Sequence, residues 1–165
     1  MPSRHKQWIA DMYQIIQKTL YRQRQALKVL DSLLQEEYDL LRQRDTNGVV
    51  SLEFSIHELI RQIAVEKTWV MGLLQGGKVR DYAALLPEEQ GKVLLDLYNE
   101  IDEGEQKCSR QASNNAQFSL ALLDQSQRTM NELHKKMTPH NAITYGRRGY
   151  MSEQQPQATI ISGRL

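Results

Sequence analysis

Residues 72–79, "GLLQGGKV", have the spacing of a nucleotide-binding loop. Gly72 and the pair Gly77-Lys78 satisfy G-x-x-x-x-G-K, in which backbone amides cradle phosphates. A phosphate loop of this kind follows a buried strand and ends in Ser or Thr, whose hydroxyl binds Mg²⁺. Here a helical pattern precedes the glycines, and Val79 stands where the hydroxyl is needed. We therefore interpret the glycine pair as a helix end and predict no nucleotide site.

The histidines and the cysteine also lack the partners that chemistry would require. Helical di-iron sites use Glu-x-x-His pairs, and this spacing does not occur in the chain. A metal or catalytic site needs several converging donors, whereas the histidines are scattered. They are His5, His57, His134 and His140. The single Cys108 falls at an apolar helix position and is interpreted as a small buried side chain. We predict no catalytic, metal or cofactor site, and no enzyme.

The composition excludes two further classes. Lys and Arg total 21 against 20 for Asp and Glu, so no strong field favours nucleic acid. Apolar runs are only a few residues long, far short of the ~20 that span a bilayer, and residues 1–10 lack a signal-peptide core. A single cysteine agrees with a reducing compartment. These observations predict a cytoplasmic protein with no membrane span, and the 165 residues fit one domain.

Apolar residues spaced by three and four predict three long helices. We expect them at about residues 4–45, 51–75 and 87–136, in an all-α fold of three antiparallel helices resembling an elongated bundle or coiled coil. Asn47-Gly48 is expected to end the first helix and Pro87 to open the third. Ser51 is expected to cap the second helix, and the alternative start is the capping-box sequence "SIHE" at Ser55 to Glu58. The expected inward positions are Ile9, Tyr13, Ile16, Leu20, Leu27, Leu30, Leu34 and Leu41; Leu52, Ile56, Leu59, Ile63, Val70 and Leu73; and Leu94, Leu97, Ile101, Cys108, Ala112, Asn115, Leu122 and Leu133. Gln23, Glu37 and Glu66 interrupt the first two patterns.

The helical period ends at Thr138-Pro139, where Gly, Pro, Gln and Ser accumulate. We therefore predict a helical domain over residues 1–137 and a flexible tail over residues 138–165. The tail nevertheless carries apolar and aromatic residues, some within "TYGRRGY". We expect it to bind a partner while contributing little to folding, through Tyr145, Gly146, Gly149, Tyr150, Ile160 and Ile161; the alternative is an end that binds nothing.

Several of these segments together resemble the FlgN family of flagellar export chaperones. "LLQEEYDLLRQRD" and "ELIRQIAVEKTWVMGLL" resemble the first two helices of that family, and "QASNNAQFSLALL" resembles an Asn-containing stretch of its third. "TYGRRGY" resembles the Tyr-Gly element that follows the last helix. The resemblance covers most of the chain, although the spacer "DTNGVVS" is longer than the family pattern suggests.

The resemblance implies a cytoplasmic chaperone for hook-filament junction proteins, which holds their terminal amphipathic helices before type III export. Further implied partners are components of the export apparatus. Helix-in-groove recognition needs an apolar groove and no catalytic residue. On the third helix, Asn115, Phe118 and Leu122 are the expected contacts. The chaperone would be a monomer or a weak homodimer, and the alternative is a structural coiled-coil protein that self-associates.

Overall fold

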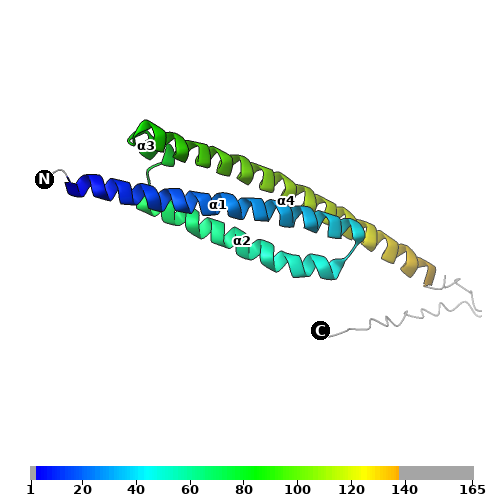
Figure 1. The fold of residues 1–165 in the computed structure, drawn as a ribbon. Coiled ribbons are helices and arrows are strands. Elements are labelled where there is room, and N and C mark those ends of the chain that lie inside the picture. Colours follow the sequence, from blue (N-terminus) through cyan, green and yellow to red (C-terminus); the bar gives the residue numbers. More distant parts are fainter. Residues whose placement is uncertain (1–2, 138–165) are drawn as a thin grey trace, which may run out of the picture. The chain divides into compact units, whose positions relative to one another are not determined.

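The computed structural model describes residues 3–137, and side chains from residue 11 onward. Four helices make up this part: α1 (Ser3–Gln43), α2 (Thr46–Leu73), α3 (Val79–Ala84) and α4 (Glu88–Met137) (Figure 1). Residues 3–137 contain no strand, so the all-α prediction is confirmed. The chain divides into two units, Met1–Asp124 and Gln125–Leu165, and the described part of the second is the end of α4.

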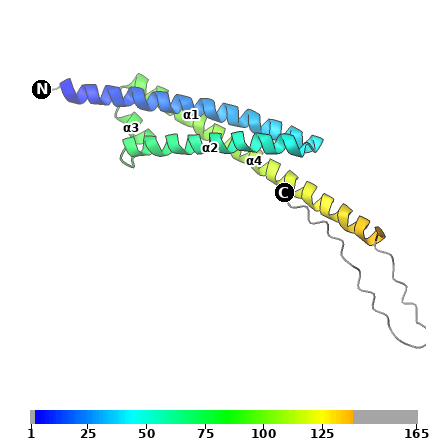
Figure 2. The ribbon, with the colours of Figure 1, turned by 90° about the horizontal axis from the view of Figure 1, so that it is seen from below.

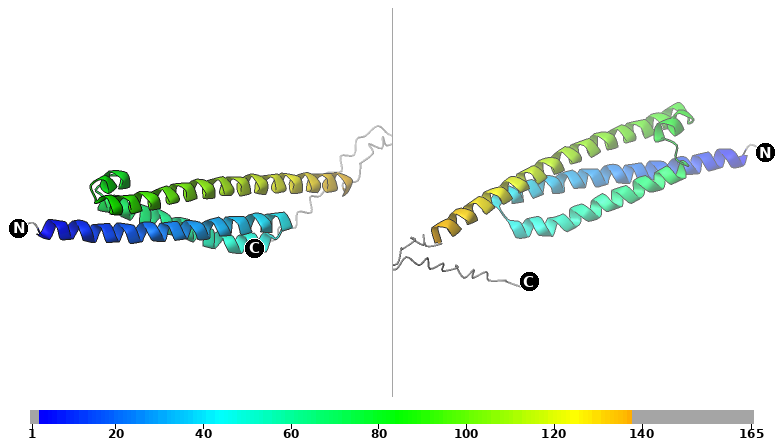
Figure 3. Two further views of the ribbon diagram at one scale, coloured as in Figure 1. Left: turned by 45° about the horizontal axis from the view of Figure 1, so that its top comes forward. Right: turned by 180° about the vertical axis from the view of Figure 1, so that it is seen from behind.

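In the first unit, the three long helices alternate in direction. α1 and α2 are antiparallel neighbours, and α4 runs parallel to α1 (Figures 2 and 3). Ion pairs between the helices show their register. Successive residues of α1 pair with successive residues of α4, as expected for two parallel helices. The pairs are Arg22–Glu66 at 3.0 Å, Arg24–Glu100 at 3.1 Å, Asp31–Lys107 at 2.7 Å and Lys67–Glu105 at 2.9 Å. Because these pairs are partly exposed, they contribute little to stability and mainly report the alignment.

The predicted apolar positions form the core of this unit. Its buried members are Ile16, Leu20, Leu27, Leu30 and Leu34 of α1, Ile56, Ile63 and Val70 of α2, and Leu94, Leu97, Ile101 and Cys108 of α4. Leu41 is also buried. Cys108 lies inward as expected, and its thiol donates to the Leu27 carbonyl oxygen at 3.5 Å. Burial of such side chains, at ~25 cal/mol per Å² of apolar surface, is the main source of stability.

Two predicted inward positions on α4, Ala112 and Leu133, are wrong, because both are exposed. The register set by Lys67 and Glu105 brings Ile60 of α2 to the level of Ala112, and both are exposed. α2 and α4 have therefore stopped burying each other at this level. Leu133 lies in the second unit, where its side chain is also exposed.

The predicted break between the first two helices is also wrong. Arg44, with φ of 59°, rather than Asn47-Gly48, takes the left-handed position that ends α1. The Arg44 amide donates to the Leu41 carbonyl oxygen at 3.1 Å, and the Asp45 amide donates to the Leu40 carbonyl oxygen at 3.0 Å. These two hydrogen bonds form a Schellman motif.

α2 begins at Thr46, not at Ser51, because Asp45 provides the cap. Its carboxylate accepts from the Gly48 amide at 3.0 Å, so Asn47-Gly48 fits inside the first turn. The Ser51 hydroxyl instead donates to the Asn47 carbonyl inside the helix, at 2.9 Å. The other helix ends lie within two residues of their predicted positions.

The six-residue helix α3 is missing from the prediction, because it is too short to show a period. α2 ends with a second Schellman pattern, in which Gln75 and Gly76 have φ of 50° and 82°. The glycine-lysine segment thus joins two helices, and α2 rather than a strand precedes it. α3 contributes Val79, Tyr82 and Ala83 to the core.

Gly91 allows the start of α4 to approach α3 closely. A Cβ at this position would lie 2.5 Å from the Ala83 carbonyl oxygen, which belongs to the backbone and cannot rotate away. A Cβ at Gly72, near the end of α2, would meet no atom within 4 Å. The close contact requires glycine at position 91, whereas position 72 has space for a larger side chain. The two positions can therefore be compared directly.

We predict that Gly91→Ala lowers the free energy of unfolding by about 1 to 3 kcal/mol, because α3 and α4 must separate. Gly72→Ala should leave it unchanged or raise it by up to ~1 kcal/mol, because alanine favours helix and fits there. Urea unfolding followed by circular dichroism measures both. Equal stability of the two variants would contradict the close approach.

Candidate functional site

α2 carries apolar side chains on its exposed surface as well as in the core. They are Val50, Phe54, Ile60, Val65, Trp69 and Met71, and Phe54 is 77% exposed. A helix on the surface of a bundle usually presents charged residues on the side opposite its buried stripe. An apolar outer surface of this kind is typical of an interaction site. We call these six residues the α2 outer surface.

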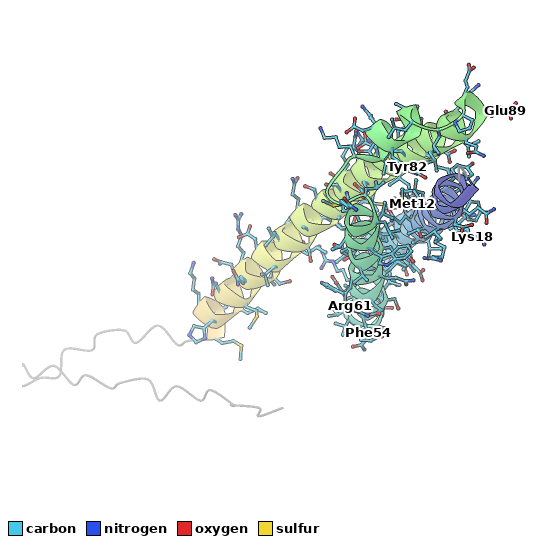
Figure 4. The ribbon with its side chains drawn as sticks, turned by 90° about the vertical axis from the view of Figure 1, so that its left-hand side faces the viewer. Met12, Lys18, Phe54, Arg61, Tyr82 and Glu89 are labelled. Carbon is cyan, nitrogen blue, oxygen red and sulfur yellow. The ribbon has the colours of Figure 1, made fainter. Side chains whose placement is uncertain are left out.

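Part of the α2 outer surface lies directly opposite the core. At ~100° per residue, Val50, Phe54 and Val65 lie within about 60° of one another, and Ile56 and Ile63 lie on the other side. In Figure 4, Phe54 and Arg61 lie in the lower part of α2, farther from Tyr82 of α3 than the end of that helix. Arg61 is paired with Glu58 at 2.6 Å, so the charges here are mutually neutralised.

A groove lies between α1, α2 and α4, beside the turn that follows α2. Its volume is about 320 Å³. Leu20, Val70 and Ile101 contribute apolar atoms from the three helices, and Met71 connects the groove with the α2 outer surface. Gln23 also lines it and is only 3% exposed, and among the described residues its Nε2 has no hydrogen-bond partner.

The predicted contact Asn115 is turned inward and forms a buried polar network. Its Nδ2 donates to the Leu34 carbonyl oxygen and to Glu37 Oε2, both at 2.7 Å. Its Oδ1 accepts from Gln111 Nε2 at 2.9 Å. Every polar atom of the Asn115 side chain is therefore engaged, which explains how an amide can lie in an apolar seam.

The network continues to α2 through two carboxyl groups. Burial raises the pKa of Glu37, the hydrogen bond from Asn115 lowers it, and the neighbouring Glu53 carboxyl raises it again. The Nδ1 atom of His57 lies 3.1 Å from Glu53 Oε2. When His57 is protonated, its positive charge lowers the pKa of Glu37. The net effect is a pKa for Glu37 above the ordinary 4.5 of glutamate.

The other two predicted contacts on α4 are half-buried. The Phe118 ring lies 5.5 Å from that of Tyr38, in a mainly polar cleft of about 620 Å³ between α1 and α4. Leu122 lies one turn further along. Phe118 and Leu122 thus share one side of α4, whereas Asn115 points into the bundle, and none of the three lines the groove beside Gln23.

The predicted tail contacts lie outside the described residues. Within residues 11–137, the His, Cys, Asp and Glu side chains form no cluster of three that could hold a metal ion. Among the described helices, none is sufficiently long and apolar to cross a membrane.

The α2 outer surface and Gln23 were missed by the sequence analysis. The apolar period of α2 predicted one inward stripe, and it says nothing about apolar residues between the positions of that stripe, such as those of "TWVM". The signal was the number of apolar residues on α2 that fall outside that stripe. Gln23 was interpreted as an interruption of the stripe, although it lies inside it.

An all-helical bundle that leaves apolar side chains of α2 exposed has a feature typical of proteins that bind other proteins. The sequence profile of the FlgN protein family matches residues 12–153. The chain therefore belongs to the FlgN family, a family of flagellar export chaperones and not of enzymes. The search of curated proteins and the search of solved structures found no match to the chain.

The raised pKa of Glu37 predicts a pH-dependent stability. Above pH 4.5 the folded chain retains a proton that the unfolded chain releases, so the free energy of unfolding falls as the pH rises through this window. Glu37→Gln removes the titration and keeps an oxygen for Asn115. We expect this variant to lose less stability between pH 4.5 and 7 than the wild type, measured by urea unfolding. Glu36→Gln, at an exposed neighbour, is the control; equal slopes for all three proteins would contradict the assignment.

Proposed function

We propose that this chain is a cytoplasmic chaperone that holds hook-filament junction proteins before type III flagellar export. Family membership supports export chaperoning in general. The observation that carries the finer proposal is the α2 outer surface, which leaves apolar side chains of a folded bundle in water.

The proposed clients are the terminal amphipathic helices of junction proteins. An amphipathic helix buries its apolar side when it lies in a groove or against another helix, and it needs anchors at intervals of three and four residues. Val50 and Phe54, and again Val65 and Trp69, provide such intervals on α2. Covering the client helix removes the surface through which clients would self-associate.

Self-association of the chain itself is a second candidate, because the same α2 outer surface could pair with another copy. A coiled-coil assembly of this kind has a stable higher mass without a client. The chaperone that we propose is a monomer or a weak homodimer, and it forms a defined complex only with its client. Sedimentation of the purified chain, alone and with a junction protein, distinguishes the two.

We predict that Val65→Asp weakens binding of a junction-protein terminal helix by roughly five- to a hundredfold. The variant places a charge where an apolar contact of ~1 to 3 kcal/mol is lost. Val29→Asp on α1 is the matched control, because Val29 and Val65 are 52% and 57% exposed and both lie within helices. Calorimetric titration measures the dissociation constants, and thermal melting confirms that both variants remain folded.

Equal affinity of Val65→Asp and Val29→Asp would remove α2 from the binding site. The same titration with a chain truncated after Met137 tests the tail, which we propose as part of the partner-binding surface through Tyr145, Tyr150, Ile160 and Ile161. We expect weaker binding with an unchanged melting temperature. An unchanged dissociation constant would instead leave the helical unit as the whole client site.

A further inference from the structure

The carboxyl groups of Glu37 on α1 and Glu53 on α2 meet near the closed end of the α1–α2 hairpin. Glu37 is only 9% exposed, and its Oε2 atom accepts from Asn115 Nδ2 at 2.7 Å. Its carboxyl group also makes a side-chain hydrogen bond with that of Glu53. An ionised carboxylate only accepts hydrogen bonds, so two carboxyl groups can bond each other only when one of them carries a proton. The contact therefore holds one proton between two helices.

Few apolar contacts hold the hairpin together beyond these two carboxyl groups. We call residues 38–52, which run from the end of α1 through the turn into α2, the hairpin tip. Leu41 is the single buried residue of this segment, all of which the structure describes, and Leu52 is partly buried. Local opening costs least where little apolar surface is buried. One polar contact at the base of the tip therefore has a large share in keeping it closed.

The groups around the contact make its proton sensitive to pH. Burial raises the pKa of Glu37 most, and Glu53 adds to the rise through its negative charge and its hydrogen bond. From α2, protonated His57 lowers the pKa of Glu37, and from α4 the uncharged amide of Asn115 lowers it through its hydrogen bond. On α1 itself, the adjacent Glu36 is exposed. The net result is that the folded chain keeps this proton at pH values above 4.5, where free glutamate releases it.

We propose that the hairpin tip is a pH-sensitive device, closed while Glu37 and Glu53 share a proton and opened when that proton leaves. Once both groups are ionised, their hydrogen bond is lost and two negative charges lie side by side between α1 and α2. The tip then separates while the core around Leu27 and Leu30 stays packed. Val50 of the α2 outer surface lies within the tip, so its position changes too. This device belongs to the chain alone and does not depend on client binding.

NMR of the wild-type chain without a client tests the device. The carboxyl carbon of Glu37 reports the proton, and hydrogen exchange of the Asp45 and Val49 amides, both bonded in the closed tip, reports opening. Dividing each rate by that of the unfolded chain at the same pH removes the intrinsic pH dependence of exchange. Because proton occupancy falls as the pH rises above 4.5, protection should fall toward pH 7. We expect a roughly two- to tenfold fall, the value of one hydrogen bond, with the midpoint of the Glu37 titration.

Two variants should move the midpoint of the Glu37 titration in opposite directions. Glu53→Gln removes the charge that raises the pKa of Glu37, so the midpoint should move to lower pH. His57→Gln removes the charge that lowers this pKa, so the midpoint should move to higher pH. Glu36→Gln, at the exposed neighbour, is the matched control and should leave the midpoint in place.

Two results would overturn the proposal. If the protection of the Asp45 and Val49 amides stays constant while Glu37 titrates, the tip remains closed without the proton. If Glu53→Gln leaves the midpoint of Glu37 in place, the proton is not shared between the two helices. Neither result bears on the proposed function, because no client is present in these experiments.

Discussion

The structure depends on the apolar face of α1, which packs against α2 and α4 at once. Six of the buried apolar residues come from α1, from Ile16 to Leu41, whereas α2 buries three. Because α1 supplies the middle of the bundle, α2 needs only a narrow stripe to hold its place. The six apolar residues of the α2 outer surface stay exposed in the described structure, and this is the surface to which we assign client binding.

Polar groups inside the same seam determine how the helices align. Asn115 can reach both the Leu34 carbonyl and Glu37 only in the parallel register that α1 and α4 adopt. A shift by one turn would leave a buried amide and a buried carboxyl without partners, at about 1 to 3 kcal/mol for each neutral group. Apolar packing alone tolerates such shifts far better. Asn115 and Glu37 therefore provide specificity for this register, whereas Gln23 Nε2 has no hydrogen-bond partner within the part of the chain that the structure describes.

The sequence was sufficient to predict the long helices and most of the core, because a period near 3.6 repeated over many turns is a strong signal. Local competition between turn residues was harder to judge. Asn47-Gly48 suggested a break, but the Asp45 cap and the left-handed Arg44 place the turn earlier. Whether Ala112 is exposed depends on where α2 and α4 separate. The apolar period of a single helix cannot predict that point. The α2 outer surface was missed because it required counting the apolar residues of α2 that lie outside its inward stripe, and the tail contacts stay a prediction.

Hydrogen exchange of the wild-type chain, with and without an intact junction protein, tests the central claim most directly. Outward-facing side chains on α2 cannot protect amides by themselves, but a docked client helix suppresses the local opening through which the amides of a surface helix exchange. Our account predicts slower exchange across α2 and in the turn at residues 74–78, with little change in the middle of α1. Protection confined to α4, with α2 exchanging at the same rate in both states, would contradict it.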